Sequence, residues 1–350
     1  MAKARIGFVG TGGMGQMAHL RNYVILEDCE VVALAEARTD MGGKVGQRYD
    51  IPHVYADFRE MFDAHELDGA VVSQRYRNHV ALLPEIYPRV KHVFTEKPLA
   101  LGVETGRRLA DAADQAGCVH MVGYHKRSDI ASEYALKLIQ QWKASGEMGK
   151  LRYVRVLMPA GDWVAEGFRG LIGSTQKYPK LASEPNPPDL DEAAAKQYDA
   201  FVNYYIHQVN YMRFLLGEPY QVTYAEKSGV LMAVQSASGV AGTIEMTPYR
   251  TTVAWEESAL VAFEKGYLTI RLPAPMAANR AGSVEIHQDP GDGAVPQRIE
   301  PTLPWVHAMR NQAANFVKVC RGEMAPPCAA REAVEDLKVA REYIRLRFGQ

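Results

Sequence analysis

The stretch that decides the fold reads Arg5-Ile-Gly-Phe-Val-Gly-Thr-Gly-Gly-Met-Gly15, a short apolar run followed at once by closely spaced glycines. The run predicts a buried strand, and the residues that follow Gly15 carry apolar side chains at helical spacing. Here Gly10 permits a tight turn, Gly12 lets a pyrophosphate approach the backbone, and Gly15 lets helix and strand pack closely. The stretch therefore predicts a strand, turn and helix that bind phosphate groups at the helix N-terminus.

Short apolar runs recur through the first third of the chain. They cover residues 30–35, 69–73, 91–95 and 118–122, with helical patterns over 14–26 and 102–116. Buried runs that alternate with amphipathic helices are typical of βαβ units and a parallel sheet. We therefore expect residues 1–125 to form an NAD(P)-binding Rossmann domain, which is a doubly wound parallel sheet.

The pattern changes after about residue 125. A helical segment over 128–145 precedes runs with period-2 alternation, at 151–157, 230–234, 241–246 and 266–272. These runs predict a second domain of the α+β class over 126–350, with a large open and mostly antiparallel sheet for substrate binding and oligomerisation. Prolines 179, 185, 187 and 188 predict a long surface loop over 178–191, inserted into this second domain. The last helices, over 307–345, can also pack back on the Rossmann domain.

Composition excludes several classes of function. The 350 residues include 40 Lys and Arg against 41 Asp and Glu, so no global positive field favours nucleic acid. The four cysteines lack the spacing of a zinc site, so we expect no metal and free thiols in a reducing compartment. No run approaches the roughly 20 apolar residues of a membrane helix, and a strand-like run begins at once without a signal sequence. We expect a cytoplasmic protein without a membrane or nucleic-acid partner.

The second run ends at Glu36, 21 residues after Gly15. A carboxylate at this point is expected to accept hydrogen bonds from the adenosine ribose diol and to repel a 2′-phosphate. It favours NAD over NADP as the cofactor. Arg38 softens that preference, because its guanidinium can stack on adenine or pair with a phosphate. A solvent-exposed strand end is the alternative interpretation of Glu36.

A second signal is Thr95-Glu-Lys-Pro98, at the end of the apolar run over 91–95. Ligands of open α/β sheets bind at the carboxyl ends of the strands. Lys97, held between a carboxylate and a rigid proline, is well placed to exchange a proton with a hydroxyl if burial lowers its pKa. An exposed loop lysine is the alternative.

Together these elements resemble the Gfo/Idh/MocA oxidoreductase family. The glycine turn, the acidic residue at 36, Asn78-His79, Glu96-Lys97-Pro98 and Gly123-Tyr124 carry the resemblance, which covers nearly the whole chain. It implies NAD(P)-dependent chemistry at a carbon of a sugar or polyol, in a homodimer or homotetramer. Cofactor contacts are expected from the turn, the acidic strand end and the neighbouring strand ends, namely Gly10, Gly12, Gly13, Met14, Gly15, Glu36, Arg38, Ser73, His79, Glu96 and Lys97.

The resemblance also implies an Asp and a His four residues apart on a helix. The matching positions are Asn203 and His207, which together with Asn210 are expected on one helix face. An asparagine cannot exchange a proton near neutral pH, and without a carboxylate partner His207 should stay closer to neutral. We therefore expect Lys97 to carry the proton and His207 to orient the hydroxyl, with Asn203 as a third catalytic candidate.

Substrate contacts are expected where the last Rossmann strand ends and after the first strand of the second domain. Trp163 can stack on the apolar face of a sugar, and Arg127 or Arg169 can bind hydroxyls or a carboxylate. Salt bridges and an ordinary interface aromatic are the alternative. The full set of substrate candidates is Tyr124, His125, Arg127, Trp163, Arg169, Asn203 and His207.

Three functions stay open from the sequence. The leading one is an NAD-dependent dehydrogenase acting on a sugar, glycoside or cyclitol. The second is a glycosidase or lyase that uses tightly bound NAD for transient oxidation and elimination, with Tyr124 or His125 as a further acid or base. The third is a non-catalytic nucleotide-binding protein, which Asn203 favours and Lys97 opposes.

Overall fold

The computed structural model describes residues 2–291 and 293–349 and divides into two compact units. Among the described residues, the first unit comprises 2–124, 166–187 and 309–334, and the second comprises 125–165, 188–291, 293–308 and 335–349. The first division falls after residue 124, and the functional domain boundary at 125/126 stays a prediction. Two later segments, 166–187 and 309–334, join the first unit, so much of the proline-rich loop belongs with the Rossmann sheet and not with the second domain.

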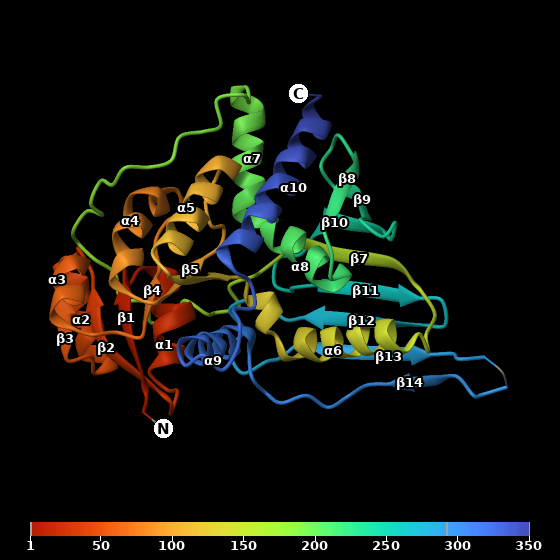
Figure 1. Cartoon of the computed structure of the whole chain (residues 1–350), viewed down its shortest axis with the longest axis horizontal. Helices are drawn as coiled ribbons and strands as arrows, with labels where there is room; N and C mark the ends of the chain where they lie inside the picture. Colours follow the sequence, from red (N-terminus) through yellow and green to blue (C-terminus); the bar gives the residue numbers. More distant parts are fainter. Residues whose placement is uncertain (1, 292, 350) are drawn as a thin grey trace. The chain divides into compact units, whose positions relative to one another are not determined.

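The first unit is built on a parallel sheet with the strand order β3-β2-β1-β4-β5-β6 (Figure 1). This order is that of a doubly wound dinucleotide-binding sheet, which confirms the predicted Rossmann fold. The short β3 was not predicted, because an isolated run of three residues carries no periodicity. The strands are β1 (Ala4–Val9), β2 (Cys29–Ala35), β3 (His53–Tyr55), β4 (Gly69–Val72), β5 (His92–Glu96) and β6 (Val119–Gly123).

Helices pack on this sheet and bury its apolar side chains. The helix after the glycine turn begins as a π-helix, η1, and continues as the short α1. The helical elements are η1 (Gly15–Leu20), α1 (Arg21–Tyr23), α2 (Thr39–Tyr49), α3 (Phe58–Ala64), η2 (Tyr76–Asn78), α4 (His79–Ile86), η3 (Tyr87–Arg89), α5 (Val103–Gln115) and α9 (Ala308–Cys320). Gly117, with φ of +65°, follows α5 in the left-handed conformation expected of it.

Helix α9 completes the first core, although it lies about 200 residues further along the chain than β6. Its Phe316 is fully buried, with ring contacts to Tyr23 and Phe94 at centroid distances of 6.4 and 5.7 Å. Figure 1 shows α9 beside α1. Helix α9 is therefore part of the first core.

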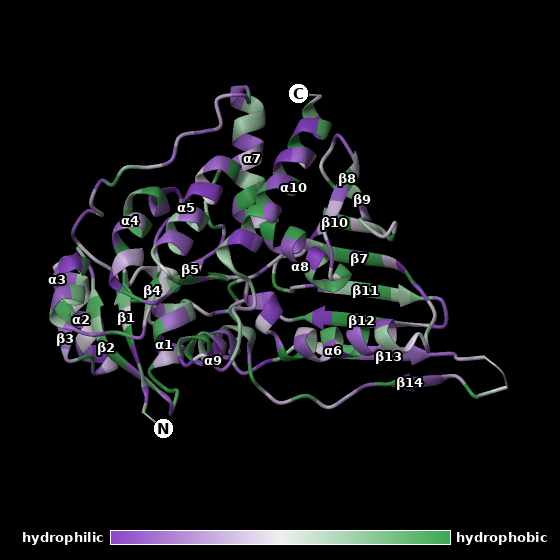
Figure 2. Ribbon diagram, viewed as in Figure 1, coloured by the Kyte–Doolittle hydropathy of each residue, from purple (hydrophilic) through white to green (hydrophobic). Residues whose placement is uncertain are grey.

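The second unit is built on a mostly antiparallel sheet with the order β14-β13-β12-β11-β7-β10-β9-β8, in which β7 and β10 run parallel. Alternating burial along β11 and β12 places one face of the sheet in the core, and the exposed β14 is polar (Figure 2). The strands are β7 (Leu151–Ala160), β8 (Tyr220–Ala225), β9 (Leu231–Ser236), β10 (Ala241–Arg250), β11 (Glu257–Phe263), β12 (Gly266–Leu272), β13 (Ser283–Gln288) and β14 (Gln297–Ile299).

Helices cover the buried face of this sheet. Helix α6 lies along β12 and β13 (Figure 1), and it begins after Asp129, whose carboxylate accepts a hydrogen bond from the Ala131 amide at 2.9 Å. Such a cap satisfies an amide that has no partner within the helix. The helical elements are η4 (His125–Ser128), α6 (Ile130–Ser145), α7 (Glu192–Tyr204), α8 (Ile206–Leu216) and α10 (Ala330–Phe348). Among the described residues, no helix is both long enough and apolar enough to cross a membrane.

The position of α9 in the first core gives a stability prediction. Replacing Phe316 by Ala should lower the free energy of unfolding by about 3–5 kcal/mol, because the change removes a buried ring and leaves a cavity. Lys318→Ala, at an exposed position of the same helix, should change it by less than about 0.5 kcal/mol. Urea unfolding followed by circular dichroism measures both. Equal effects of the two substitutions would contradict a core role for α9.

Candidate functional site

The glycine turn after β1 has the geometry that a bound pyrophosphate requires. Gly10 has φ of +90°, and a Cβ built on Gly15 would lie 2.7 Å from the Gly10 carbonyl oxygen, so neither position accepts a side chain without rearrangement. At Gly12 a Cβ would meet nothing closer than Arg38 Nη2 at 4.0 Å. The turn thus presents open backbone at Gly12, and it fits a dinucleotide there. Ser73, a predicted cofactor contact, packs its side chain against Gly15.

Glu36 lies at the end of β2 beside this turn and is almost fully buried. Its Oε2 accepts hydrogen bonds from the Thr11 amide at 2.9 Å, from Thr11 Oγ1 at 3.2 Å and from Arg38 Nη2 at 3.2 Å. Its Oε1 accepts from the Arg38 amide and Nε at 3.1 and 2.8 Å. Burial by itself raises the pKa of Glu36, but the hydrogen bonds from Arg38 and Thr11 outweigh it and lower the pKa. Glu36 is therefore an ionised carboxylate fixed by the chain itself.

Arg38 is held by this ion pair and also faces an aromatic ring. Its guanidinium carbon lies 5.3 Å from the ring centroid of Tyr178, a residue of the first unit's 166–187 segment. Local sequence patterns gave no signal for Tyr178 as a neighbour of Arg38, because 140 residues separate the two. The structure therefore adds Thr11 and Tyr178 to the candidate cofactor residues.

Lys97 follows β5 at the same carboxyl edge of the sheet and is half-buried. Its amide donates to Glu96 Oε2 at 3.2 Å, and the Lys97–Pro98 peptide is cis. The other oxygen of Glu96 accepts from Nε2 of the buried His19 at 2.7 Å. His19 belongs to η1, the helix that the glycine turn opens, and sequence reasoning did not identify it. The pair His19–Glu96 therefore ties the lysine-bearing turn to the helix of the cofactor turn.

Two buried histidines contact the residues that flank Lys97 in the chain. His79 Nδ1 hydrogen-bonds to the Leu99 carbonyl at 2.8 Å, which requires a proton on Nδ1. His120 contacts Thr95 Oγ1 and the Tyr87 hydroxyl, each at 2.9 Å. Burial lowers the pKa of His79 to about 4 and that of His120 to about 3. Both rings are therefore neutral at physiological pH, and His79, a predicted cofactor residue, holds the backbone just after Lys97.

In the second unit, the helix expected to carry Asn203, His207 and Asn210 is two helices. Helix α7 ends at Tyr204 and α8 begins at Ile206, with Tyr205 at φ of −88° and ψ of −2° between them. The prediction of one helix face was therefore wrong. A run of aromatic and β-branched residues gave helical periodicity without marking the break. Asn203 is exposed at the end of α7, and His207 lies half-buried in the first turn of α8.

Two buried polar networks hold α8 just after His207, one through Gln208 and one through Asn210. Gln208 Nε2 donates to Glu257 Oε1 at 2.7 Å, and the other oxygen of Glu257 pairs with Lys126 Nζ at 2.7 Å. Both charged side chains are nearly inaccessible. Removing one partner of a buried ion pair costs much free energy, because the other charge is left without a partner. The pair therefore fixes the position of η4 relative to α8.

The second network runs through Asn210. Its Oδ1 accepts from Arg127 Nε at 2.6 Å, and its Nδ2 donates to Asp336 Oδ2 at 2.8 Å. Arg213 completes the network with an ion pair to Asp336 at 2.6 Å. Arg127 is 5% exposed and its guanidinium also lies over Phe214. Arg127 and Asn210 are therefore part of a buried network, and the substrate contact expected of Arg127 stays a prediction.

The remaining substrate candidates are divided between the two units. His125 of η4 makes an edge contact with the His207 ring at a centroid distance of 4.7 Å in the second unit, where Trp163 is half-buried. Buried Tyr124 and exposed Arg169 belong to the first unit. Within residues 2–291 and 293–349, no cluster of three or more His, Cys, Asp or Glu side chains has the arrangement to hold a metal ion.

Comparison with known proteins agrees with the cofactor half of this site. Residues 4–124 match the profile of the Gfo/Idh/MocA family, described as an oxidoreductase family with an NAD-binding Rossmann fold. The predicted resemblance and the choice of NAD are confirmed by this match.

Relatives extend the comparison beyond the first unit. The myo-inositol 2-dehydrogenase of Thermotoga maritima is 23% identical over 241 residues, which are 69% of this chain and 62% of that protein. A glycosyl hydrolase family 109 protein of Shewanella sp. strain MR-4 is 29% identical over 132 residues, 35% of this chain and 28% of that protein. The chain thus spans less than two thirds of the curated relatives it matches. An NAD-binding oxidoreductase from Klebsiella pneumoniae shares the fold, with a TM-score of 0.75, 17% identity, and coverage of 99% and 98% of the two chains.

The lowered pKa of His79 gives a prediction about acid stability. Between pH 6.5 and about 4 the unfolded chain takes up a proton at this residue that the folded chain does not, so stability is lost as the pH falls. His79→Asn keeps a donor for the Leu99 carbonyl but does not titrate. It should reduce the loss of unfolding free energy between pH 7 and pH 5 by about 2 kcal/mol.

Urea unfolding at the two pH values measures this loss. Gln47→Asn, at an exposed position on α2, is the control and should leave the loss as it is in the unsubstituted chain. An unchanged loss in His79→Asn would show that this imidazole is not kept neutral by burial.

Proposed function

With residues 4–124 belonging to the Gfo/Idh/MocA oxidoreductases and their NAD-binding Rossmann fold, we propose that this chain is an NAD-dependent dehydrogenase. Its substrate is a sugar, glycoside or cyclitol, oxidised at a carbon that bears a hydroxyl group. The inositol dehydrogenase among its relatives supports this substrate class. Lys97 is the proposed proton carrier, and His207 the proposed group that orients the hydroxyl.

One observation carries the proposal. The glycine turn and Lys97 lie at the carboxyl edge of one parallel sheet, and a 2.7 Å side-chain contact between His19 and Glu96 joins the helix after the turn to the loop that carries Lys97. A reaction that moves a hydride and a proton needs a dinucleotide and a proton carrier in fixed relative positions. The first unit supplies both on one rigid framework.

The chain's own residues then have distinct tasks. Open backbone at Gly12 receives the pyrophosphate, while Glu36 and Arg38 face the adenosine end. When bound, NAD supplies the acceptor for the hydride that leaves the substrate carbon. Lys97 takes the hydroxyl proton at Nζ, so that an O–H bond breaks, an N–H bond forms and the C–O bond becomes a carbonyl. His207 hydrogen-bonds to that oxygen, and Asn203 assists without exchanging a proton.

The direct test is a substrate panel. Sugars, uronates, glycosides and inositols are incubated with the chain and NAD or NADP, and absorbance of the reduced cofactor is followed. We expect net reduction of NAD with at least one member. Failure on every member, with NAD bound, would overturn the dehydrogenase proposal.

A second candidate function is a glycosidase or lyase that uses tightly bound NAD for transient oxidation and elimination. It is favoured by the family 109 glycosyl hydrolase relative. In that reaction the substrate carbon is oxidised, the acidified neighbouring C–H loses its proton, and the leaving group departs. Water then adds to the unsaturated product, and the carbonyl is reduced back by the hydride first removed. No free reduced cofactor accumulates, so glycoside cleavage without net absorbance change distinguishes this reaction from the first.

We also propose that the chain works in the cytoplasm as a homodimer or homotetramer. Its four cysteines are free thiols, as a reducing compartment favours. The open sheet of the second unit is the proposed subunit interface, and light scattering of the purified chain measures the oligomeric state.

Lys97→Met should lower kcat by about 10²–10⁴ if the lysine carries the proton. The affinity for NAD should change little, because methionine keeps the shape of the side chain. Lys91→Met, at an exposed position just before β5, is the control and should retain full activity. Unchanged kcat in Lys97→Met would show that another group takes the hydroxyl proton.

His207 and Lys97 should show strong coupling in a double-mutant cycle. If both act on one hydroxyl, His207→Ala combined with Lys97→Met should lose less kcat/KM than the product of the two single losses. The cycle is measured on the best substrate of the panel. Losses that multiply would show that the two residues act independently, and they would contradict the proposal that His207 orients the reacting hydroxyl.

A further inference from the structure

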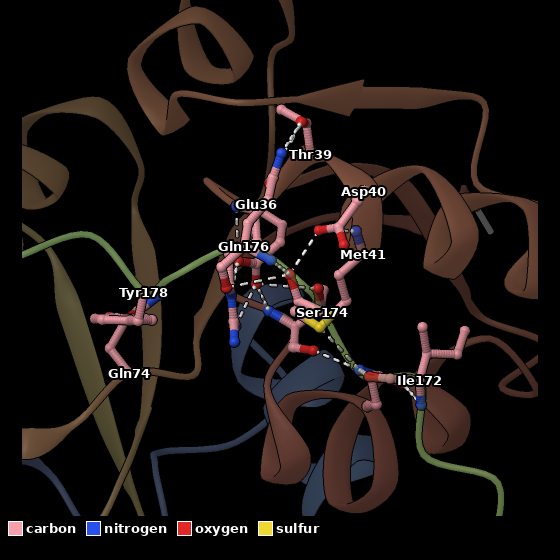
Figure 3. A network of polar contacts seen from close by, with 12 residues as sticks. Glu36, Thr39, Asp40, Met41, Gln74, Ile172, Ser174, Gln176 and Tyr178 are labelled. Atoms are coloured by element: carbon pink, nitrogen blue, oxygen red, sulfur yellow. Dashed lines mark hydrogen bonds and ion pairs between the residues drawn. The ribbon is translucent and has the colours of Figure 1, made fainter.

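Residues 166–187, here called the strap, run along the carboxyl edge of the parallel sheet within the first unit (Figure 3). They contact the loops that follow β1, β2, β4 and β5. A dinucleotide bound to a sheet of this kind lies along the same edge. The strap and the cofactor therefore share one surface of the sheet.

The glycine turn meets the first part of the strap. A Cβ built on Gly13 would lie 3.2 Å from the Phe168 ring. The side chain of fully buried Gln16 binds the Ile172 backbone in both directions, donating to its carbonyl at 3.0 Å and accepting from its amide at 3.1 Å. The strap is thereby fixed to the helix that the glycine turn opens.

The first turn of α2, which follows β2, contacts the middle of the strap. Asp40 accepts from Ser174 Oγ at 2.6 Å, and its other oxygen accepts from the Thr175 amide and hydroxyl at 2.9 and 3.0 Å (Figure 3). Hydrogen bonding by Ser174 and Thr175 lowers the pKa of Asp40 to about 2. These contacts fix the strap to Asp40, which lies two residues after Arg38 in the chain.

Tyr178 lies beside the position expected for the adenosine. Its ring centroid is 5.3 Å from the Arg38 guanidinium and 5.8 Å from that of Arg75, and its hydroxyl donates to Gln74 Oε1. Arg38 in turn pairs with Glu36, the carboxylate expected beside the ribose. The ring therefore joins the loops after β2 and β4 on the outer side of that carboxylate.

Glu184 anchors the far end of the strap. Its buried carboxylate accepts from the Leu101 and Gly102 amides at 2.8 and 2.9 Å, in the loop between β5 and α5. Its own carbonyl accepts from Arg77 Nη1 at 2.8 Å. The strap is thus fixed at both ends and along its middle, and it cannot swing aside by breaking one contact.

We infer that the strap is the outer wall of the dinucleotide site and slows the dissociation of NAD, with Tyr178 as the residue that closes the adenosine end. This inference rests on the proposed function. A cofactor enclosed between the sheet edge and the strap leaves only when several of these hydrogen bonds open together.

The test measures retained and exchanging NAD, independently of activity. The full chain is purified without added cofactor, saturated with NAD, gel-filtered and denatured, and the released dinucleotide is quantified. Exchange is then followed with radiolabelled NAD. We expect about one NAD per chain after gel filtration, and dissociation at least about tenfold faster in Tyr178→Ala, which corresponds to roughly 1.4 kcal/mol.

Two variants complete the design. Tyr178→Phe keeps the ring between the two guanidinium groups and should retain most of the slow dissociation. Tyr134→Ala, at an exposed position on α6 of the second unit, is the matched control and should dissociate NAD as the unsubstituted chain does. Bound NAD should also slow tryptic cleavage after the exposed Lys177 and Lys180.

The possible outcomes separate this inference from the proposed function. Rapid exchange in the unsubstituted chain, or equal dissociation from Tyr178→Ala, would overturn the role of the strap while net reduction of NAD by a polyol upheld the dehydrogenase. Tighter NAD binding by Tyr178→Ala would also overturn it, because the ring would then occupy the adenine position itself. A chain that binds no NAD in any form would overturn both.

Discussion

The structure depends on the close approach of the Gly10 carbonyl and the Gly15 backbone, which places the first strand and the following helix in direct contact. Any side chain at Gly15 would collide with that carbonyl, and the positive φ of Gly10 is unfavourable for other residues. This constraint leaves the turn short and its backbone exposed at Gly12. The same turn positions the end of β2, because Glu36 accepts a hydrogen bond from the Thr11 amide.

From this turn a continuous polar connection leads to the chemistry-bearing loop. His19 stands one helical turn beyond Gly15 and contacts Glu96, which in turn accepts the Lys97 amide. His79 fixes the backbone just beyond it at Leu99. The proposed cofactor turn and the proposed proton carrier are therefore joined by one series of hydrogen bonds within the first unit. The π-helical form of η1 occurs at this point, as such bulges often do at functional sites.

In the second unit, buried polar contacts hold the start of helix α8, which carries His207. His207 sits at a break between two helices, where the backbone has less support than within a helix. Two buried networks hold the residues of α8 that follow His207. One is the ion pair of Lys126 with Glu257, and the other joins Arg127 to Asp336 through Asn210. These pairs are costly to disrupt from one side, so they define the position of the α8 start more sharply than apolar packing would.

Much of this was determined by the sequence itself: the glycine turn, the principal strands of the Rossmann sheet, the acidic end of β2 and the lysine after β5. Those features are local, because burial periodicity and a requirement for positive φ are properties of a few neighbouring residues. The break at Tyr205, the pairing of His19 with Glu96 and the placement of Tyr178 beside Arg38 were decided by the tertiary structure. Contacts across 77 or 140 residues depend on the path of the whole chain, and no local pattern of side chains encodes that path.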